Sequence, residues 1–174
     1  ILGGALVALS PDIQRAVLGV GGFPYAMLLS RSSDFVTYFM LFKEKFPDSR
    51  DVSLLVNGLI QQLWDPGESA GYAYAMNRDP LPGTEAKEVL IQVAYGDPQV
   101  STLGSRVMAR AYGAKSVAPA IMDVYGVEEA VAPFQGSAYV EWSYPDGATI
   151  PVDNLPPEGA DAHECPRREP EAID

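Results

Sequence analysis

Residues 88–100, with the sequence EVLIQVAYGDPQV, decide the fold of this chain. All but one of residues 89–95 are apolar, which is typical of a short strand buried on both faces in a parallel sheet. Gly96 and Pro98 end the strand, because glycine frees the backbone and proline moves the preceding residue away from helical geometry. The pattern predicts Asp97 on a sharp loop at the carboxyl end of the strand, where open α/β sheets collect catalytic groups. Gly-Asp-Pro is also ordinary turn chemistry, so a plain turn aspartate is the alternative interpretation.

The segment upstream of this strand predicts one further strand and two helices. Residues 16–20 form a second short apolar run, which indicates another buried strand. Residues 32–46 and 51–64 have the periodicity of amphipathic helices, and Ser32 offers N-cap chemistry to the first of them. The apolar face expected for the second helix consists of Val52, Leu55, Val56, Leu59 and Leu63.

Downstream, the alternation of helix and strand continues. Residues 102–112 predict a helix that ends at Gly113, and residues 118–124 predict a strand. Residues 134–144 predict an edge strand. The order of elements predicts the α/β class, with a mostly parallel sheet and helices on both faces.

Composition limits the classes of function. The chain of 174 residues is long enough for one domain with a real core, and 47% of its residues are hydrophobic. A net charge of −11 argues against nucleic-acid binding, which needs clustered Lys and Arg. A single cysteine, Cys165, permits neither an internal disulfide nor a thiolate metal cluster.

His163, the only histidine of the chain, changes the interpretation of Asp97. A carboxylate after a strand, followed by a histidine in a late loop, is the order of the second and third members of a hydrolase triad. In such a triad the carboxylate orients the imidazole, and the imidazole takes the proton of the nucleophile. Asp123, expected at a strand end before Gly126, is the rival acid. A surface loop histidine is the alternative interpretation of His163.

Three stretches carry a resemblance to a known family. VLIQVAYGDPQV (89–100) is similar to a strand-Gly-x-Asp-x-x-Val acid loop, and GADAHECPRREP (159–170) is similar to a histidine loop before a last helix. ILGGAL (1–6) resembles the helix that directly follows a nucleophile elbow. On these residues the chain resembles the C-terminal half of an α/β-hydrolase of the lipase and esterase kind.

The resemblance implies a partial α/β-hydrolase domain over residues 1–174, with a helical cap-like insertion at residues 25–82. It implies that Asp97 is the acid and His163 the base of a Ser-Asp-His triad acting on carboxylic esters or lipids, without cofactor or metal. Phe23 and Tyr25 are predicted as substrate-pocket residues.

The nucleophile is missing from this sequence. No G-x-S-x-G motif occurs in the 174 residues, so we expect the serine to lie outside the chain and the chain alone to be inactive. The chain also opens on the apolar segment ILGGALVAL without an initiator methionine. We therefore expect a fragment whose partner is the N-terminal half of the same protein.

Two other classes of function remain as alternatives. The chain could be a non-catalytic, acidic α/β binding or assembly domain, in which case Asp97 and His163 would lie far apart. A metal-dependent hydrolase is the weakest alternative, because one histidine cannot supply a usual zinc site. The sequence leaves open whether the protein is an oligomer and where it works; a secreted or cell-envelope enzyme is one interpretation.

Overall fold

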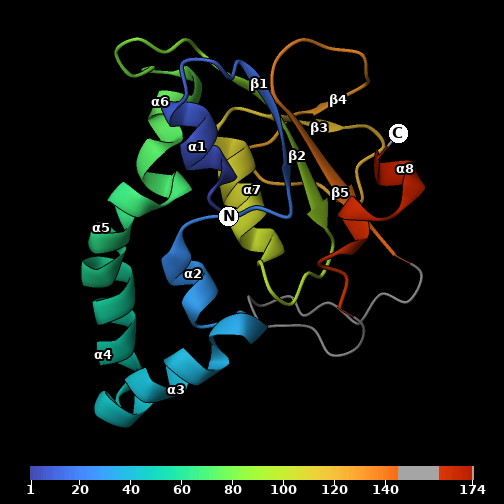
Figure 1. The fold of residues 1–174 in the computed structure, drawn as a ribbon. Coiled ribbons are helices and arrows are strands. Elements are labelled where there is room, and N and C mark those ends of the chain that lie inside the picture. Colours follow the sequence, from blue (N-terminus) through green and yellow to red (C-terminus); the bar gives the residue numbers. More distant parts are fainter. Residues whose placement is uncertain (145–160, 174) are drawn as a thin grey trace.

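The computed structural model describes residues 1–144 and 161–173. A five-stranded sheet lies at its centre, with the strand order β1-β2-β5-β3-β4 (Figure 1). Every pair of neighbouring strands is parallel, so the predicted α/β fold with a parallel sheet is confirmed. The strands are β1 (Arg15–Gly19), β2 (Glu88–Ala94), β3 (Lys115–Val117), β4 (Glu129–Ala130) and β5 (Ala138–Trp142).

Strand β2 is buried on one face and only partly covered on the other, so the predicted burial on both faces is only partly confirmed. Val89, Ile91 and Val93 are buried in the main core, which they share with Met108 and Tyr112 at the helix that follows β2. On the opposite face Gln92 donates a side-chain hydrogen bond of 2.7 Å to the backbone oxygen of Ala172. One side of the sheet therefore carries the helices α1 (Gly3–Leu9), α6 (Ala73–Asn77) and α7 (Thr102–Ala111), and the other side carries α8 (Pro170–Ile173), as Figure 1 shows.

The helices fall into two groups. Those beside the sheet are α1 (Gly3–Leu9), α6 (Ala73–Asn77), α7 (Thr102–Ala111) and α8 (Pro170–Ile173). The others form an arm that extends away from the sheet, and they are α2 (Tyr25–Leu29), α3 (Val36–Lys45), α4 (Ser49–Ser53) and α5 (Gln61–Trp64) (Figure 1). Short helical turns complete the described chain: η1 (Ser33–Phe35), the π-helical η2 (Leu54–Ile60), η3 (Asp65–Gly67), η4 (Ser69–Tyr72) and η5 (Cys165–Arg167).

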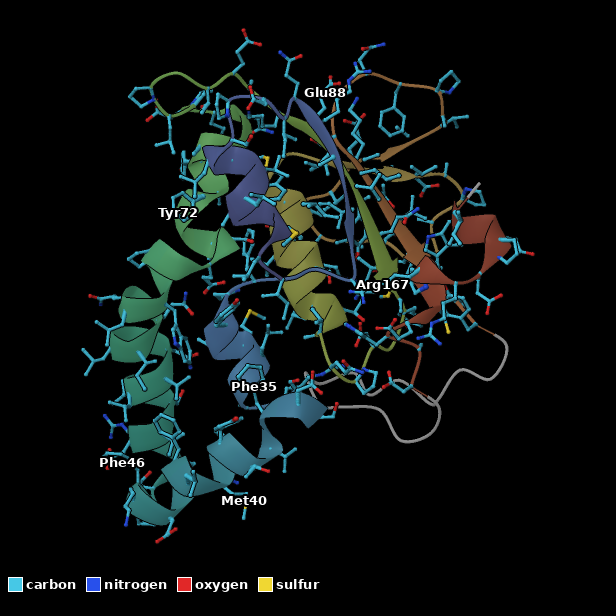
Figure 2. The ribbon with its side chains drawn as sticks, viewed as in Figure 1. Phe35, Met40, Phe46, Tyr72, Glu88 and Arg167 are labelled. Carbon is cyan, nitrogen blue, oxygen red and sulfur yellow. The ribbon has the colours of Figure 1, made fainter. Side chains whose placement is uncertain are left out.

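The arm has a small core of its own. Ala26, Val52 and Val56 are buried there, and partly buried rings such as Phe35 pack against them. Met40 and Phe46 lie on the outer part of the same arm and are exposed (Figure 2). The segment between β1 and β2 is thus helical wherever it has regular structure, and its role as a cap stays a prediction.

The helix predicted at residues 51–64 is present, but the expected buried face is partly wrong. Val52 and Val56 are buried, whereas Leu59 and Leu63 are 63% and 78% exposed. Val52, Val56, Ile60 and Trp64 pack in the arm core, so this face repeats every four residues across the π-helical segment η2, wider than the roughly 3.6 residues of an α-helical turn. This change of period rotates the two leucines to the surface.

Two strand predictions are also wrong. Residues 118–124 form no strand, and β3 ends at Val117. Pro119 has no backbone N–H and cannot donate a hydrogen bond to a neighbouring strand. The strand predicted at residues 134–144 exists as β5, but it pairs with both β2 and β3 and is therefore central. The neighbours of a strand depend on where each crossover connection returns to the sheet. The sequence of the strand itself does not determine that position.

Candidate active site

Asp97 lies where its sequence predicts, on the loop directly after β2. Gly96 has a φ of +78°, a backbone conformation that glycine adopts without a steric penalty. Asp97 is fully buried, with 1% of its side chain exposed, and its Oδ1 accepts hydrogen bonds of 2.8 Å from the backbone N–H groups of both Gln99 and Val100. These two bonds hold the carboxylate in one orientation at the carboxyl end of the strand.

His163 meets this carboxylate. Its Nδ1 lies 2.7 Å from Asp97 Oδ2, so the predicted contact between the two side chains is confirmed. Both side chains are buried. They come from segments that follow the neighbouring strands β2 and β5, at the edge where parallel sheets place ligand and catalytic groups.

The contact sets the chemistry of the imidazole. An ionised carboxylate only accepts hydrogen bonds, so Nδ1 carries the proton that it donates and Nε2 is the unprotonated nitrogen of the neutral ring. The hydrogen bond from His163 to Asp97 raises the pKa of the imidazole, although burial opposes the shift. His163 can therefore act as a base, and its hydrogen bond to Asp97 fixes Nε2 as the nitrogen that accepts a proton.

Asp161 joins the two loops of the site, a role that the sequence analysis did not assign. Its Oδ1 accepts a hydrogen bond of 3.0 Å from the backbone N–H of His163, and its Oδ2 accepts one of 2.8 Å from Gln99 Nε2. The first of these bonds is an Asx turn, which an aspartate two residues before another residue can form. The Asx turn could have been predicted from the local sequence, but the hydrogen bond between Asp161 and Gln99 could not.

Val20 marks the third strand end near the site. It follows β1, its φ is +49°, and its side chain is 1% exposed. A β-branched residue in this region is strained, and such strain clusters at functional sites. The side chain packs with Ala94 and Ala162, which are close in sequence to Asp97 and His163. The β-propensity of valine gives no indication of this conformation.

The remaining candidate residues lie elsewhere. Asp123 is exposed in the loop after β3, and the structure pairs His163 with Asp97 instead. Phe23 is buried in the main core, edge-on to Tyr112 with 5.6 Å between ring centroids. Tyr25 is half-buried against the ring of Trp64 at 5.9 Å. Both contacts favour a packing role, and the assignment of Phe23 and Tyr25 to a substrate pocket stays a prediction.

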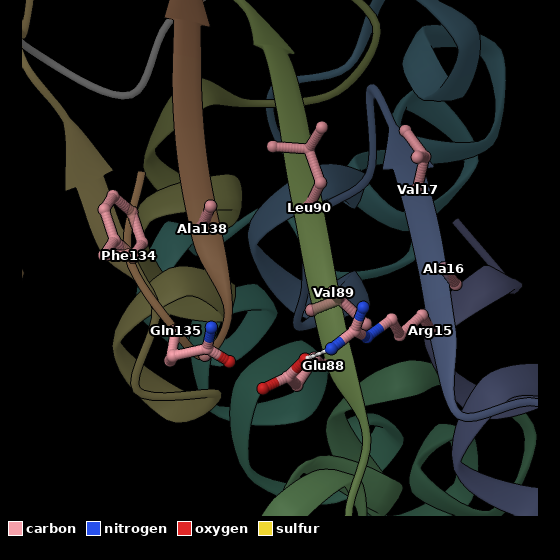
Figure 3. Close-up of a pocket in the computed structure, with 10 residues that line it drawn as sticks. Arg15, Ala16, Val17, Glu88, Val89, Leu90, Phe134, Gln135 and Ala138 are labelled. Carbon is pink, nitrogen blue, oxygen red and sulfur yellow. Dashed lines mark ion pairs between the residues drawn. The ribbon is translucent and has the colours of Figure 1, made fainter. Parts of the chain in front are cut away.

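A cavity of about 480 Å³ lies at the opposite end of the strands (Figure 3). Arg15 and Glu88, the first residues of β1 and β2, form an ion pair of 3.0 Å on its wall. Val17 and Leu90 line the same face of the sheet. Because these residues begin the strands while Asp97 follows one, this cavity does not belong to the Asp97–His163 site.

Over residues 1–144 and 161–173, no group of three His, Cys, Asp or Glu side chains is placed to hold a metal ion. In the same part of the chain, no helix combines the length and apolar composition needed to cross a membrane. Comparison with protein-family models, with curated proteins and with solved structures gave no match.

Proposed function

We propose that this chain supplies the acid and the base of a serine hydrolase that acts on carboxylic esters or lipids. Asp97 is the acid, His163 is the base, and the nucleophilic serine lies outside these 174 residues. The observation that carries the proposal is the buried contact of 2.7 Å between His163 Nδ1 and Asp97 Oδ2 at the carboxyl ends of two central strands. The resemblance of the acid and histidine loops to those of α/β-hydrolases adds support.

In the proposed reaction, His163 moves protons through Nε2. It takes the proton of the serine hydroxyl as the serine attacks the ester carbonyl, and it donates this proton to the departing alcohol. It then takes a proton from the water that cleaves the acyl-enzyme and returns it to the serine. Asp97 remains ionised throughout and stabilises the imidazolium that forms in each step.

The alternative of a non-catalytic binding or assembly domain predicts no relation between Asp97 and His163. Instead the two side chains are buried in contact, and Asp161 holds both of their loops. Burial and hydrogen bonding of a carboxylate–imidazole pair at a sheet edge favour a catalytic role.

The test is an ester assay on the full-length protein. We expect His163→Ala to lower kcat for a p-nitrophenyl ester by about a thousandfold or more. The variant should also lose covalent labelling by a fluorophosphonate, because labelling needs a serine activated by its base.

Asp123→Asn is the matched control, since Asp123 is an exposed acid outside the site. It should keep the wild-type rate within about twofold, as expected for a surface substitution. Full activity in a folded His163→Ala protein would rule out the proposed hydrolase.

A further inference from the structure

Arg31 is a buried cation that the proposed mechanism does not use. It follows α2, and only 5% of its surface is exposed. Its Nε and Nη1 atoms are buried and have no hydrogen-bond partner among the described residues. No ion pair found in residues 1–144 and 161–173 includes Arg31.

Such a group is unusual, because a buried charge is costly unless it is paired and hydrogen-bonded. Arg106 shows the ordinary solution in the same chain. Its guanidinium holds the buried Glu141 carboxylate with two bonds, of 2.6 and 2.9 Å. Burial also removes water from the Arg31 guanidinium, but no ion pair like that of Arg106 within the described residues offsets this cost. The Arg31 guanidinium is therefore available to a negatively charged group from outside the described chain.

Arg31 lies beside the candidate active site. The backbone N–H of Ser33 donates a hydrogen bond of 3.0 Å to the carbonyl of Pro98, which ties the Arg31 turn to the acid loop. Burial lowers the pKa of the Arg31 guanidinium, and the negative charge of Asp97 opposes this lowering.

Holding the Asp97 carboxylate in place does not explain why Arg31 is buried there. The carboxylate already accepts bonds from two backbone N–H groups and from the imidazole. Arg31 approaches it without forming an ion pair within 4.0 Å. Its charge is thus near the reacting groups while its buried N–H groups stay unsatisfied.

We propose that Arg31 forms an anion-binding subsite next to the Asp97–His163 pair. Its ligand is a carboxylate or phosphate group carried by the ester substrate. This substrate class rests on the proposed hydrolase function, whereas the binding of an anion by Arg31 does not. Guanidinium groups suit this role because they always carry charge and present several donors to oxygen anions.

Thermal unfolding of the full-length protein tests binding without turnover. We expect monomethyl glutarate, which carries one carboxylate, to raise Tm, and its neutral counterpart dimethyl glutarate not to do so. Arg31→Gln should weaken the binding of monomethyl glutarate by about tenfold to a hundredfold, the loss expected for hydrogen bonds to a charged group. Arg31→Lys should retain part of the shift because it keeps the charge. A shift with inorganic phosphate in place of monomethyl glutarate would support the subsite and assign it to a phosphate-bearing ester.

The stability of the variants without ligand separates a subsite from a structural arginine. Arg31→Gln should keep Tm within about 2 °C of the wild type or raise it, because the substitution removes a buried, unpaired charge. Arg106→Gln is the matched control and should lower Tm by about 4 °C or more, because it leaves the buried Glu141 carboxylate without its cationic partner. An equal loss of Tm in Arg31→Gln would show that Arg31 is structural and overturn the proposal.

Kinetics tests the substrate class. The ratio of kcat/KM for monomethyl glutarate over dimethyl glutarate should fall about tenfold to a hundredfold in Arg31→Gln, chiefly through KM. Equal loss of kcat on both esters, with KM unchanged, would make Arg31 a positioning residue and refute the subsite. If neither ester is hydrolysed while monomethyl glutarate still binds through Arg31, the hydrolase fails and the anion site stands.

Discussion

The change Asp97→Asn tests the site most sharply, because the structure dictates how the new amide would sit. Two backbone N–H groups, of Gln99 and Val100, point at Oδ1 from 2.8 Å. Only the oxygen of an asparagine amide can accept these bonds, so its NH₂ group must occupy the position of Oδ2 and face His163 Nδ1. The imidazole must then accept at Nδ1 and carry its proton on Nε2, where it cannot take a proton from a nucleophile.

The magnitude follows from the two backbone bonds. Rotating the amide to restore the productive tautomer would leave the buried N–H of Val100 and the part-buried N–H of Gln99 facing an NH₂ group. Each unsatisfied buried donor costs about 1–3 kcal/mol, or about 2–6 kcal/mol for the pair. At about 1.4 kcal/mol for each factor of ten, the productive form is about thirtyfold to twenty-thousandfold rarer than the wrong tautomer. We expect kcat to fall by the same factor, whose upper end matches the known cost of a wrong tautomer in a serine protease triad.

Two measurements check this prediction on the full-length protein. The first is kcat for a p-nitrophenyl ester. The second is the ¹⁵N chemical shift of the imidazole nitrogens, which reports the tautomer without any turnover. Selective labelling would be simple for this chain because it contains one histidine. We expect the neutral ring to be protonated at Nδ1 in the wild type and at Nε2 in Asp97→Asn.

Retention of the Nδ1-protonated tautomer in a folded Asp97→Asn protein would refute the reasoning about the amide. A loss of kcat smaller than about tenfold together with a confirmed change of tautomer would refute the role of His163 as the base. The two outcomes are distinguishable because the spectrum reports geometry and the rate reports function.

Two further predictions concern pH and packing. The pKa of His163 is raised above the ordinary histidine value of 6.5, and the base must be neutral to act. The acidic limb of the plot of kcat against pH should therefore have its midpoint above pH 6.5. Asp97→Asn removes the charge that raises this pKa, so the acidic limb of any residual activity should move to lower pH. A midpoint below pH 6.5 in the wild type would contradict the assignment of His163 as the base. Gly71→Ala should lower the free energy of unfolding by about 1–3 kcal/mol, because the new Cβ would overlap backbone atoms of Asp65. At Gly58 a new Cβ meets no atom of the described residues within 4 Å, so Gly58→Ala should raise the free energy of unfolding by about 0.5–1 kcal/mol. Urea unfolding of both variants compares them, and equal effects would show that the close approach at Gly71 is absent.

The elements that local sequence could predict are those whose causes are local. The apolar run of β2 and the Gly-Asp-Pro turn after it depend on neighbouring residues, and both are present as predicted. The N-cap at Ser32, whose side chain accepts a bond from the N–H of Asp34, has a similarly local cause. The end of α7 before Gly113, at a φ of +62°, follows from the freedom of glycine at positive φ.

Other features were outside the reach of local patterns. The buried positions of residues 51–64 repeat every four residues across the π-helical segment η2, and they pack against other parts of the arm, such as Ala26 and Phe39. The central position of β5 came from the way in which the crossovers return to the sheet. The unpaired guanidinium of Arg31 depends on which groups surround it after folding, and a single arginine in a sequence contains no such information.

The candidate site divides in the same way. The sequence by itself placed Asp97 after a buried strand and identified His163 as the only histidine, because residue order and composition are visible along the chain. Residue order did not by itself choose between Asp97 and Asp123 as the acid, since both precede His163. Only the tertiary structure decided the partner, by bringing side chains 66 positions apart to 2.7 Å. The physical reason is that parallel strands β2 and β5 end at one edge of the sheet, so that residues distant in the chain share a single buried site.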